Sequence, residues 1–191
     1  MTIRYLKKGK NDSDKALEDE SVSETVKKTL KMIKEGGDKA VRELSEKFDN
    51  YSPKSFKLSL SEINYLIDKV PARDLEDIKF AQEQIRNFAQ AQRDSMQDIE
   101  IETMPGVILG HKNIPVQSVG CYVPGGKFPM VASAHMSIVT ANVAKVPRII
   151  ASTPPFQGKP NPAVIAAMHL GGAHEIYILG GIQAVGAMAL G

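Results

Sequence analysis

The residues that could carry chemistry in this chain gather around glycine pairs that follow apolar runs. The chain reads VPGG at residues 123–126 and LGGIQ at residues 179–183, and a predicted helix follows each. Glycine lets the backbone approach a ligand closely, and a helix N-terminus offers free N–H groups to an anion. The pattern therefore favours a nucleotide phosphate site. Neither G-x-G-x-x-G nor G-x-x-x-x-G-K-[ST] occurs, so tight strand-to-helix turns without a ligand stay an open alternative.

The histidines and the cysteine do not form a recognisable catalytic or metal motif. The four histidines are His111, His135, His169 and His174, and none shows the H-E-x-x-H spacing. His135 differs because it lies among small residues, in VASAHMS, shortly after the first glycine pair. It could face a ligand, or it could be a hydrogen-bonded residue of a packed helix. Cys121 is flanked by strand residues, which predicts a buried and inert thiol.

The elements that must position these residues are strands alternating with helices from about residue 116 onward. We predict strands at 119–123, 148–153 and 175–181, and helices at 131–144, at 162–170 and from 182. Continuous apolar strands that alternate with helices predict a parallel sheet covered on both faces. In such a sheet ligands bind beyond the carboxyl ends of the strands, where both glycine pairs lie. A sheet of three strands looks unfinished, so we expect a truncated domain.

The first part of the chain is more charged and richer in helix signals. A capping box at Ser21 and Glu24 predicts a helix that the glycine pair at 36–37 ends, and a second helix continues to about residue 48. Further predicted elements are a strand at 56–60, a short helix capped by Ser61, a helix at 72–92 with Phe88 on its buried stripe, and a hairpin at 99–112.

Composition limits the classes of function. The 191 residues carry a formal net charge of +2 and the basic residues are dispersed, which argues against a nucleic-acid partner. No apolar run reaches the length of a membrane span, and the N-terminus lacks the apolar core of a signal peptide. A single cysteine rules out an internal disulfide framework and fits a reducing compartment. We therefore predict a cytoplasmic protein that contacts neither nucleic acid nor membrane.

Four segments of the chain resemble the histidinol dehydrogenase family. They are GGDKAVRELSEKFD (36–49), IRNFAQAQ (85–92), VGCYVPGGKFPM (119–130) and LGGIQAVGAMALG (179–191). The resemblance implies a homodimeric, NAD-dependent, zinc-containing alcohol dehydrogenase built on incomplete Rossmann-like domains, which oxidises a primary alcohol through an aldehyde to a carboxylate. The segment GGKFPMVASAHMS looks more like the sulfopropanediol 3-dehydrogenase branch, which converts 2,3-dihydroxypropane-1-sulfonate to sulfolactate.

The same resemblance implies roles for particular residues. The cofactor NAD would be contacted by Tyr122, Pro124, Gly181 and Gln183. His135 would face the anionic head group of the substrate, because the histidinol dehydrogenases of histidine biosynthesis usually carry a bulky aliphatic residue at that position. The family's zinc ligands and catalytic Glu-His pair lie downstream of Gly191. No catalytic residue or metal ligand is therefore assigned in this chain, and the ligands of Zn²⁺ are expected outside it.

Taken together, the sequence predicts an α/β fold: an incomplete Rossmann-like parallel sheet preceded by a helix-rich α+β region. Residues 1–20 would be an N-terminal extension, 21–115 the helix-rich first half of domain 1, and 116–191 the first part of the NAD-binding domain. The function would be that of the N-terminal part of a dehydrogenase, inactive by itself. Two alternatives stay open, a histidinol dehydrogenase of histidine biosynthesis and a non-catalytic nucleotide-binding or dimerisation module.

Overall fold

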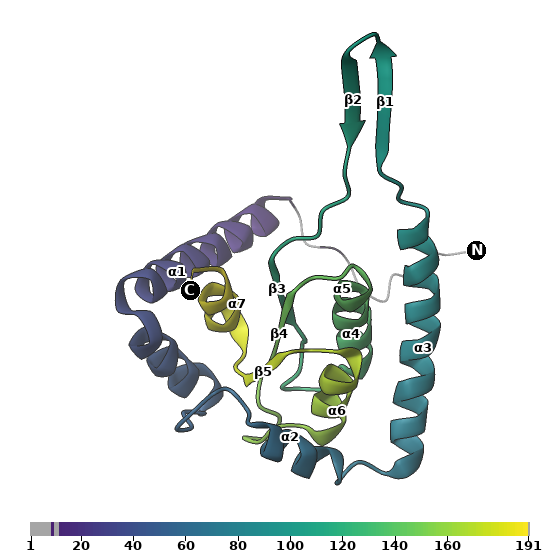
Figure 1. The fold of residues 1–191 in the computed structure, drawn as a ribbon. Coiled ribbons are helices and arrows are strands. Elements are labelled where there is room, and N and C mark those ends of the chain that lie inside the picture. The colour runs from purple at the N-terminus through teal and green to yellow at the C-terminus, as the bar shows by residue number, and fades with distance from the viewer. Residues whose placement is uncertain (1–8, 10–11, 191) are drawn as a thin grey trace, which may run out of the picture.

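A parallel sheet of three strands lies at the centre of the molecule (Figure 1). The computed structural model describes residue 9 and residues 12–190. The strands are β3 (Ser118–Tyr122), β4 (Arg148–Thr153) and β5 (Glu175–Ile178), in the order β3-β4-β5. The strands are short. They are mostly apolar because helices cover both faces of the sheet, as expected for a parallel sheet. The predicted α/β class and the parallel sheet are confirmed.

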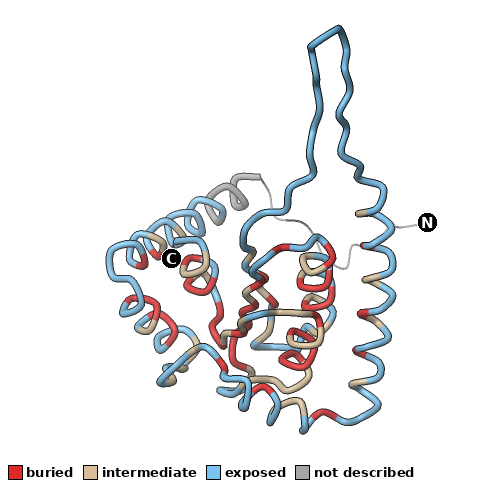
Figure 2. Tube along the Cα trace, viewed as in Figure 1, coloured by how far each residue is buried: buried red, intermediate tan, exposed pale blue. Residues whose placement is uncertain are grey.

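One face of the sheet is covered by the helices that connect its strands. A continuous helical segment joins β3 to β4 and consists of α4 (Val131–Ala134), the π-helical turn η1 (His135–Val139) and α5 (Thr140–Val143). Helix α6 (Pro162–Gly171) joins β4 to β5; the Asn161 side chain caps its start, and Gly172 ends it with a φ of 104°. Both helices agree with the predicted ranges, and Figure 2 shows buried residues along these helices and the strands.

Helices α2 (Leu60–Ile67) and α3 (Ala72–Asp94) form a further layer against this face. Phe88 of α3 was predicted on the buried stripe, but it is 67% exposed. The buried positions of α3 include Gln82, whose Nε2 donates to the backbone oxygen of Ala167 in α6 at 2.8 Å. Burial of the Gln82 side chain is tolerated because its amide is paired. The buried stripe of α3 therefore includes Gln82 and does not include Phe88.

The segment before α2 differs from the prediction in two respects. The predicted strand at 56–60 is reduced to an isolated antiparallel bridge between Lys57 and Tyr177 on the edge of β5. The helix cap is Ser59 and not Ser61, because Ser59 and Glu62 form a reciprocal capping box. Helix α2 thus begins at Leu60. The extended segment ends there and forms no longer pairing with β5.

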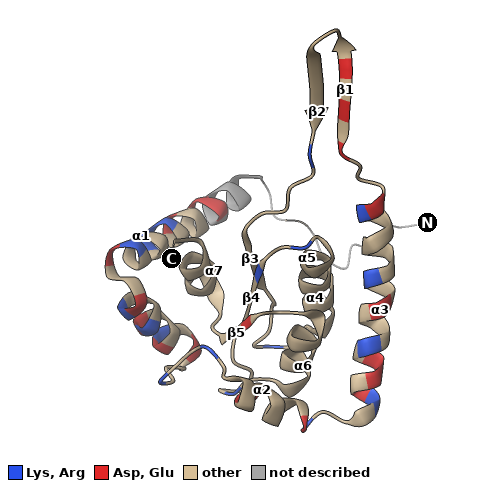
Figure 3. Ribbon diagram, in the orientation of Figure 1, with Lys and Arg blue, Asp and Glu red and all other residues tan. Residues whose placement is uncertain are grey.

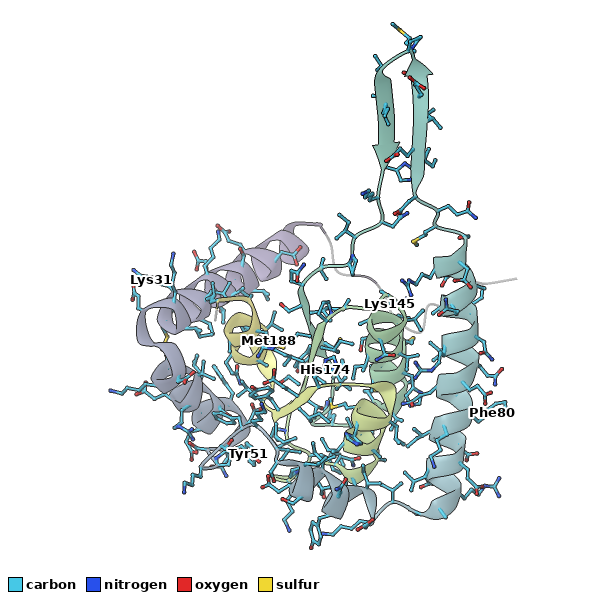
Figure 4. All side chains as sticks on the ribbon, in the orientation of Figure 1. Lys31, Tyr51, Phe80, Lys145, His174 and Met188 are labelled. Atoms are coloured by element: carbon cyan, nitrogen blue, oxygen red, sulfur yellow. The ribbon has the colours of Figure 1, made fainter. Side chains whose placement is uncertain are left out.

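The other face of the sheet is covered by α7 (Gly181–Leu190), which in turn packs against the long helix α1 (Asp12–Asp49). Gly120 of β3 lets α7 approach, because a Cβ there would lie 2.7 Å from the sulfur of Met188, a residue labelled in Figure 4. The contact between α1 and α7 is apolar and is formed by Ile33, Val41, Leu44, Leu179 and Ala184.

Helix α1 is longer than predicted. Ser21 lies inside it, so the capping box predicted at this residue is wrong. The glycine pair does not separate two capped helices but kinks one, because Gly37 takes a non-helical conformation with φ 54° and ψ −141°. Residues 1–8, 10 and 11 of the predicted N-terminal extension lie outside the described residues.

A hairpin projects from the body between α3 and β3 (Figure 1). Its strands are β1 (Ile99–Met104) and β2 (Val107–His111), and all their residues are exposed. Gly106 has a φ of 82°, as the third position of a type II turn requires, so the predicted Pro-Gly turn is confirmed. Two acidic side chains, Glu100 and Glu102, lie along β1 (Figure 3). No helix in the described part of the chain is long and apolar enough to cross a membrane.

Candidate functional site

Two of the segments singled out in the sequence meet at the carboxyl edge of the sheet. Tyr122 ends β3, Gly181 follows β5, and the parallel register brings both to the same edge although they are 59 positions apart. The backbone N–H of Gly181 donates to the Tyr122 hydroxyl at 3.3 Å. Beside them, the buried Ser152 of β4 donates its hydroxyl to the backbone oxygen of Leu179 at 2.7 Å. Ser152 was not predicted as a site residue.

Each glycine pair has two separate structural roles. The first members pack against a proline: a Cβ at Gly125 would lie 3.3 Å from Cγ of Pro154, and one at Gly180 would lie only 2.6 Å from its Cβ. The second members take left-handed conformations, with φ 83° at Gly126 and φ 62° at Gly181. The tight-turn interpretation is thus correct for both pairs. It does not exclude a ligand, because the space beside Gly126 is open apart from one Pro154 atom at 3.9 Å.

Gln183 lies in the first turn of α7 and is only 2% exposed. Its Nε2 donates to Oδ2 of Asp49, the last residue of α1, at 3.1 Å. Burial raises the pKa of the Asp49 carboxyl above its ordinary value, and the hydrogen bond from Gln183 partly offsets that rise. Asp49 was not predicted as a site residue. It ends one of the segments that resemble the family, but no local spacing connects two residues that are 134 positions apart.

A cavity of about 480 Å³ opens beside Tyr122 and the start of α7. The residues that line it are Val26, Leu30, Tyr122, Gly181, Ile182 and Val185. The lining thus combines an aromatic ring, apolar side chains and the backbone of a helix N-terminus. Pro124 is exposed at the same edge of the sheet, two residues after Tyr122. The four residues predicted to contact NAD therefore lie at one edge, with Gln183 turned inward toward Asp49.

His135 lies in the π-helical turn and is 5% exposed. Its Nε2 is enclosed and has no hydrogen-bond partner among the described residues. Burial lowers the pKa of the imidazole below its ordinary value, so the ring is neutral at pH 7. A π-helical turn is rare and occurs frequently at functional sites. Both observations make His135 unusual, while its burial on the packed side of the helix agrees with the alternative of a core residue.

The other predicted features have structural roles. Cys121 is 4% exposed, as predicted, and burial raises the pKa of its thiol. The ring of His174 accepts a hydrogen bond from the backbone N–H of Ile149 at Nδ1, at 2.8 Å, which ties the end of α6 to β4. His111 contacts the backbone oxygen of Gln97 at the base of the hairpin, at 3.1 Å.

Charged residues cluster at the opposite edge of the sheet. Glu175, the first residue of β5, pairs with Arg148 at 2.7 Å and with Lys57 at 2.8 Å. Hydrogen bonds from Arg148 and Lys57 lower the pKa of this carboxyl to about 2. A cavity of about 830 Å³ near this edge, between the end of α3 and the hairpin base, is lined by side chains of both charge signs. Because ligands of open parallel sheets bind at the carboxyl edge, neither feature defines the cofactor site.

The described residues do not fit a zinc ion. Among them, no group of three or more His, Cys, Asp or Glu side chains could hold a metal. Zinc chemistry is therefore assigned to no residue of this chain.

An open parallel sheet with a glycine turn and a helix N-terminus at its carboxyl edge defines the class of α/β proteins in which ligands bind at that edge. Within that class, the histidinol dehydrogenase family profile matches residues 12–191. The chain belongs to the histidinol dehydrogenase family. Members of this family are NAD-dependent oxidoreductases and in general bind zinc.

Three comparisons with known proteins illustrate the relationship. A histidinol dehydrogenase homolog of Shouchella clausii is 56% identical over 188 residues, which are 98% of this chain and 44% of that protein. Sulfopropanediol 3-dehydrogenase of Ruegeria pomeroyi is 44% identical over 192 residues, 100% of this chain and 43% of that protein. The crystal structure of histidinol dehydrogenase from Elizabethkingia anophelis matches with a TM-score of 0.82 at 30% identity, over 98% of this chain and 41% of that one. The chain thus spans less than half the length of these relatives.

Proposed function

We propose that this protein forms the dinucleotide-binding part of an NAD-dependent alcohol dehydrogenase, with Tyr122, Pro124, Gly181 and Gln183 in contact with NAD. The contact between the Tyr122 hydroxyl and the Gly181 backbone carries the proposal, because it joins two sequence motifs at the carboxyl edge of the sheet. When bound, NAD supplies the acceptor for a hydride from the substrate alcohol. The protein's own contribution is to line the cavity with Tyr122 and Val185, whose apolar surfaces would contact the bound ligand.

For the substrate, we propose 2,3-dihydroxypropane-1-sulfonate, oxidised through the aldehyde to sulfolactate. The sulfopropanediol 3-dehydrogenase relative supports this choice. His135 would donate a hydrogen bond to a sulfonate oxygen through Nε2, which has no partner among the described residues. Because Nε2 is enclosed, this contact requires the side chains around it to move apart when the substrate binds. Because burial lowers its pKa, the imidazole would recognise the anion as a neutral hydrogen-bond donor and not as a cation.

Oxidation of histidinol is the second candidate function. The family description and the match to the Elizabethkingia anophelis histidinol dehydrogenase favour it as strongly as the Ruegeria pomeroyi sulfopropanediol 3-dehydrogenase favours the first. The two substrates differ in charge: the sulfonated diol is an anion, whereas histidinol carries an amine. In either case we propose a cytoplasmic homodimer.

Calorimetry with NAD and an absorbance assay for NADH test both candidates. We expect this chain to bind NAD. We expect a protein of the relatives' full length that contains this chain, supplied with zinc, to form NADH with the sulfonated diol and not with histidinol. The reverse preference would assign the protein to histidine biosynthesis. NAD binding without turnover of either alcohol would assign a non-catalytic nucleotide-binding module, and absence of NAD binding would refute the proposal.

Replacement of His135 tests its role in substrate choice. In the protein of the relatives' full length, His135→Leu should raise the Michaelis constant for the sulfonate by about 10-fold, as expected for loss of a hydrogen bond to a charged group. Met136→Leu is the matched control, because Met136 is the next residue, is 60% exposed and lies on the solvent side of the helix. An unchanged constant in His135→Leu would assign His135 to the core alone.

A further inference from the structure

Asp49 reaches the cofactor site from an element that is not part of the sheet. It is the last residue of α1, and the chain leaves the helix immediately after it, since Asn50 has a φ of 47°. Its Oδ2 accepts the hydrogen bond from Nε2 of Gln183 at 3.1 Å. The same oxygen would lie 3.3 Å from a Cβ at Gly180, so the glycine leaves room for the carboxylate at the end of β5.

The chemistry of this pair determines which way the amide of Gln183 points. An ionised carboxylate can only accept hydrogen bonds, so the amide must present its NH₂ group to Asp49. The amide oxygen Oε1 then lies on the other side, over the first residue of α7, where a Cβ at Gly181 would be 2.7 Å away. Because Gln183 is only 2% exposed, the packing around it holds this orientation. On the side of Gly181, the amide of Gln183 can therefore only accept a hydrogen bond, through Oε1.

We propose that Asp49 is a positioning residue of the cofactor site, which orients the Gln183 amide so that Oε1 accepts a hydrogen bond from the ligand. The inference rests on the proposed function, in which Gln183 contacts NAD. The ligand group that Oε1 takes is a hydrogen-bond donor, such as a ribose hydroxyl or the carboxamide NH₂ of the nicotinamide. Asp49 acts through Gln183 and makes no contact with the cofactor of its own.

A double-mutant cycle on NAD affinity, measured by calorimetry, tests this arrangement. Asp49→Ala and Gln183→Ala should each weaken binding on the order of 3- to 10-fold, the usual effect of one hydrogen bond. The double variant should bind as Gln183→Ala does, because Asp49 has no effect once its partner is absent. Glu46→Ala is the control: it removes an exposed carboxylate from the same helix end, one turn earlier, and should leave the affinity unchanged.

A second pair of variants keeps the side-chain volumes and reverses the donor and acceptor. Gln183→Glu places a carboxylate against Asp49 and should weaken NAD binding at least 10-fold, because two adjacent carboxylates repel. Adding Asp49→Asn supplies an NH₂ group for that carboxylate and leaves its second oxygen as the acceptor, so affinity should return to within about 3-fold of the parent protein. This test remains usable if Asp49→Ala does not fold.

The outcomes separate this inference from the proposed function. If the parent protein does not bind NAD, both fall. If Gln183→Ala weakens binding but Asp49→Ala does not, the proposed function stands and the positioning role is refuted. If the two effects add in the double variant, Asp49 contacts the ligand independently and the inference is refuted. Failure of Asp49→Asn to recover the Gln183→Glu affinity would refute the amide orientation.

Discussion

Gly180→Ala is expected to destabilise the protein because the carboxyl edge of the sheet has no room for a side chain at this position. The new Cβ would lie 2.6 Å from Cβ and 3.1 Å from Cα of Pro154, whereas ordinary van der Waals contacts begin at 3.4 Å. Pro154 is buried, and its rigid ring and backbone cannot rotate away. The sheet edge must therefore separate by nearly an ångström to accommodate one methyl group.

Overpacking of this kind costs about 1–3 kcal/mol, and the contact with a backbone atom places Gly180→Ala in the upper half of that range. For a chain of this length each kcal/mol lowers the melting temperature by about 2–4 °C, so a cost of about 2–3 kcal/mol should lower it by about 4–12 °C. Thermal unfolding followed by circular dichroism measures it.

Gly125→Ala provides the matched control at the same proline. Its Cβ would meet the Thr153 hydroxyl at 3.1 Å and Pro154 Cγ at 3.3 Å. Both are side-chain atoms, and a shift of a few tenths of an ångström relieves both contacts. The cost should therefore be below about 1 kcal/mol. A melting temperature of Gly180→Ala within about 1 °C of the parent protein, or above that of Gly125→Ala, would refute the conclusion that Pro154 closes this edge.

Three further predictions concern paired and unpaired polar groups. Gln82→Leu should lower the free energy of unfolding in urea by about 1 kcal/mol, because it removes the hydrogen bond to Ala167. Glu175→Gln should destabilise the protein at pH 7, and denaturation curves should show this difference in stability fade between about pH 4.5 and pH 2. The pKa of the Glu175 carboxyl is lowered to about 2 in the folded state, so protonation in this range abolishes the ion pairs of the parent protein as well. Burial lowers the pKa of His135, so the unfolded state binds a proton more readily and the stability of the parent protein falls as the pH drops below about 6.5. His135→Leu should remove this part of the pH dependence, and the same dependence of stability on pH in that variant would contradict the prediction.

Local patterns in the sequence predicted the sheet well because burial and turn conformation restrict the residue types at each position. Strands buried on both faces must be apolar throughout, and helices between them must carry caps and stops such as Gly172. The hairpin turn followed from the conformation that only Gly106 adopts readily. The meeting of Tyr122 with Gly181 was also predictable, because parallel strands bring their carboxyl ends to one edge whatever covers the faces.

Errors in the prediction arose where helix docking decides the outcome. The stripe of α3 contains both Phe88 and Gln82 at helical spacings from other apolar residues, and only the contact with α6 determined that the glutamine is buried. Ser59 and Ser61 have the residue type to cap this helix. The bridge to β5 selected Ser59 because it ends the extended segment there, and Ser61 lies inside α2.

For the candidate site too, some features were predictable from the sequence and others depend on helix docking. The sequence by itself determined that glycine turns end two strands of a parallel sheet and that Tyr122, Pro124, Gly181 and Gln183 gather at its carboxyl edge, since chain order and register are enough for that. Only the tertiary structure decided that Gln183 is turned toward Asp49, that Pro154 occupies the space beside both glycine pairs, and that His135 faces the core. These contacts depend on how α1 and the connecting helices dock, and docking is a sum of many distant contacts that no local spacing records.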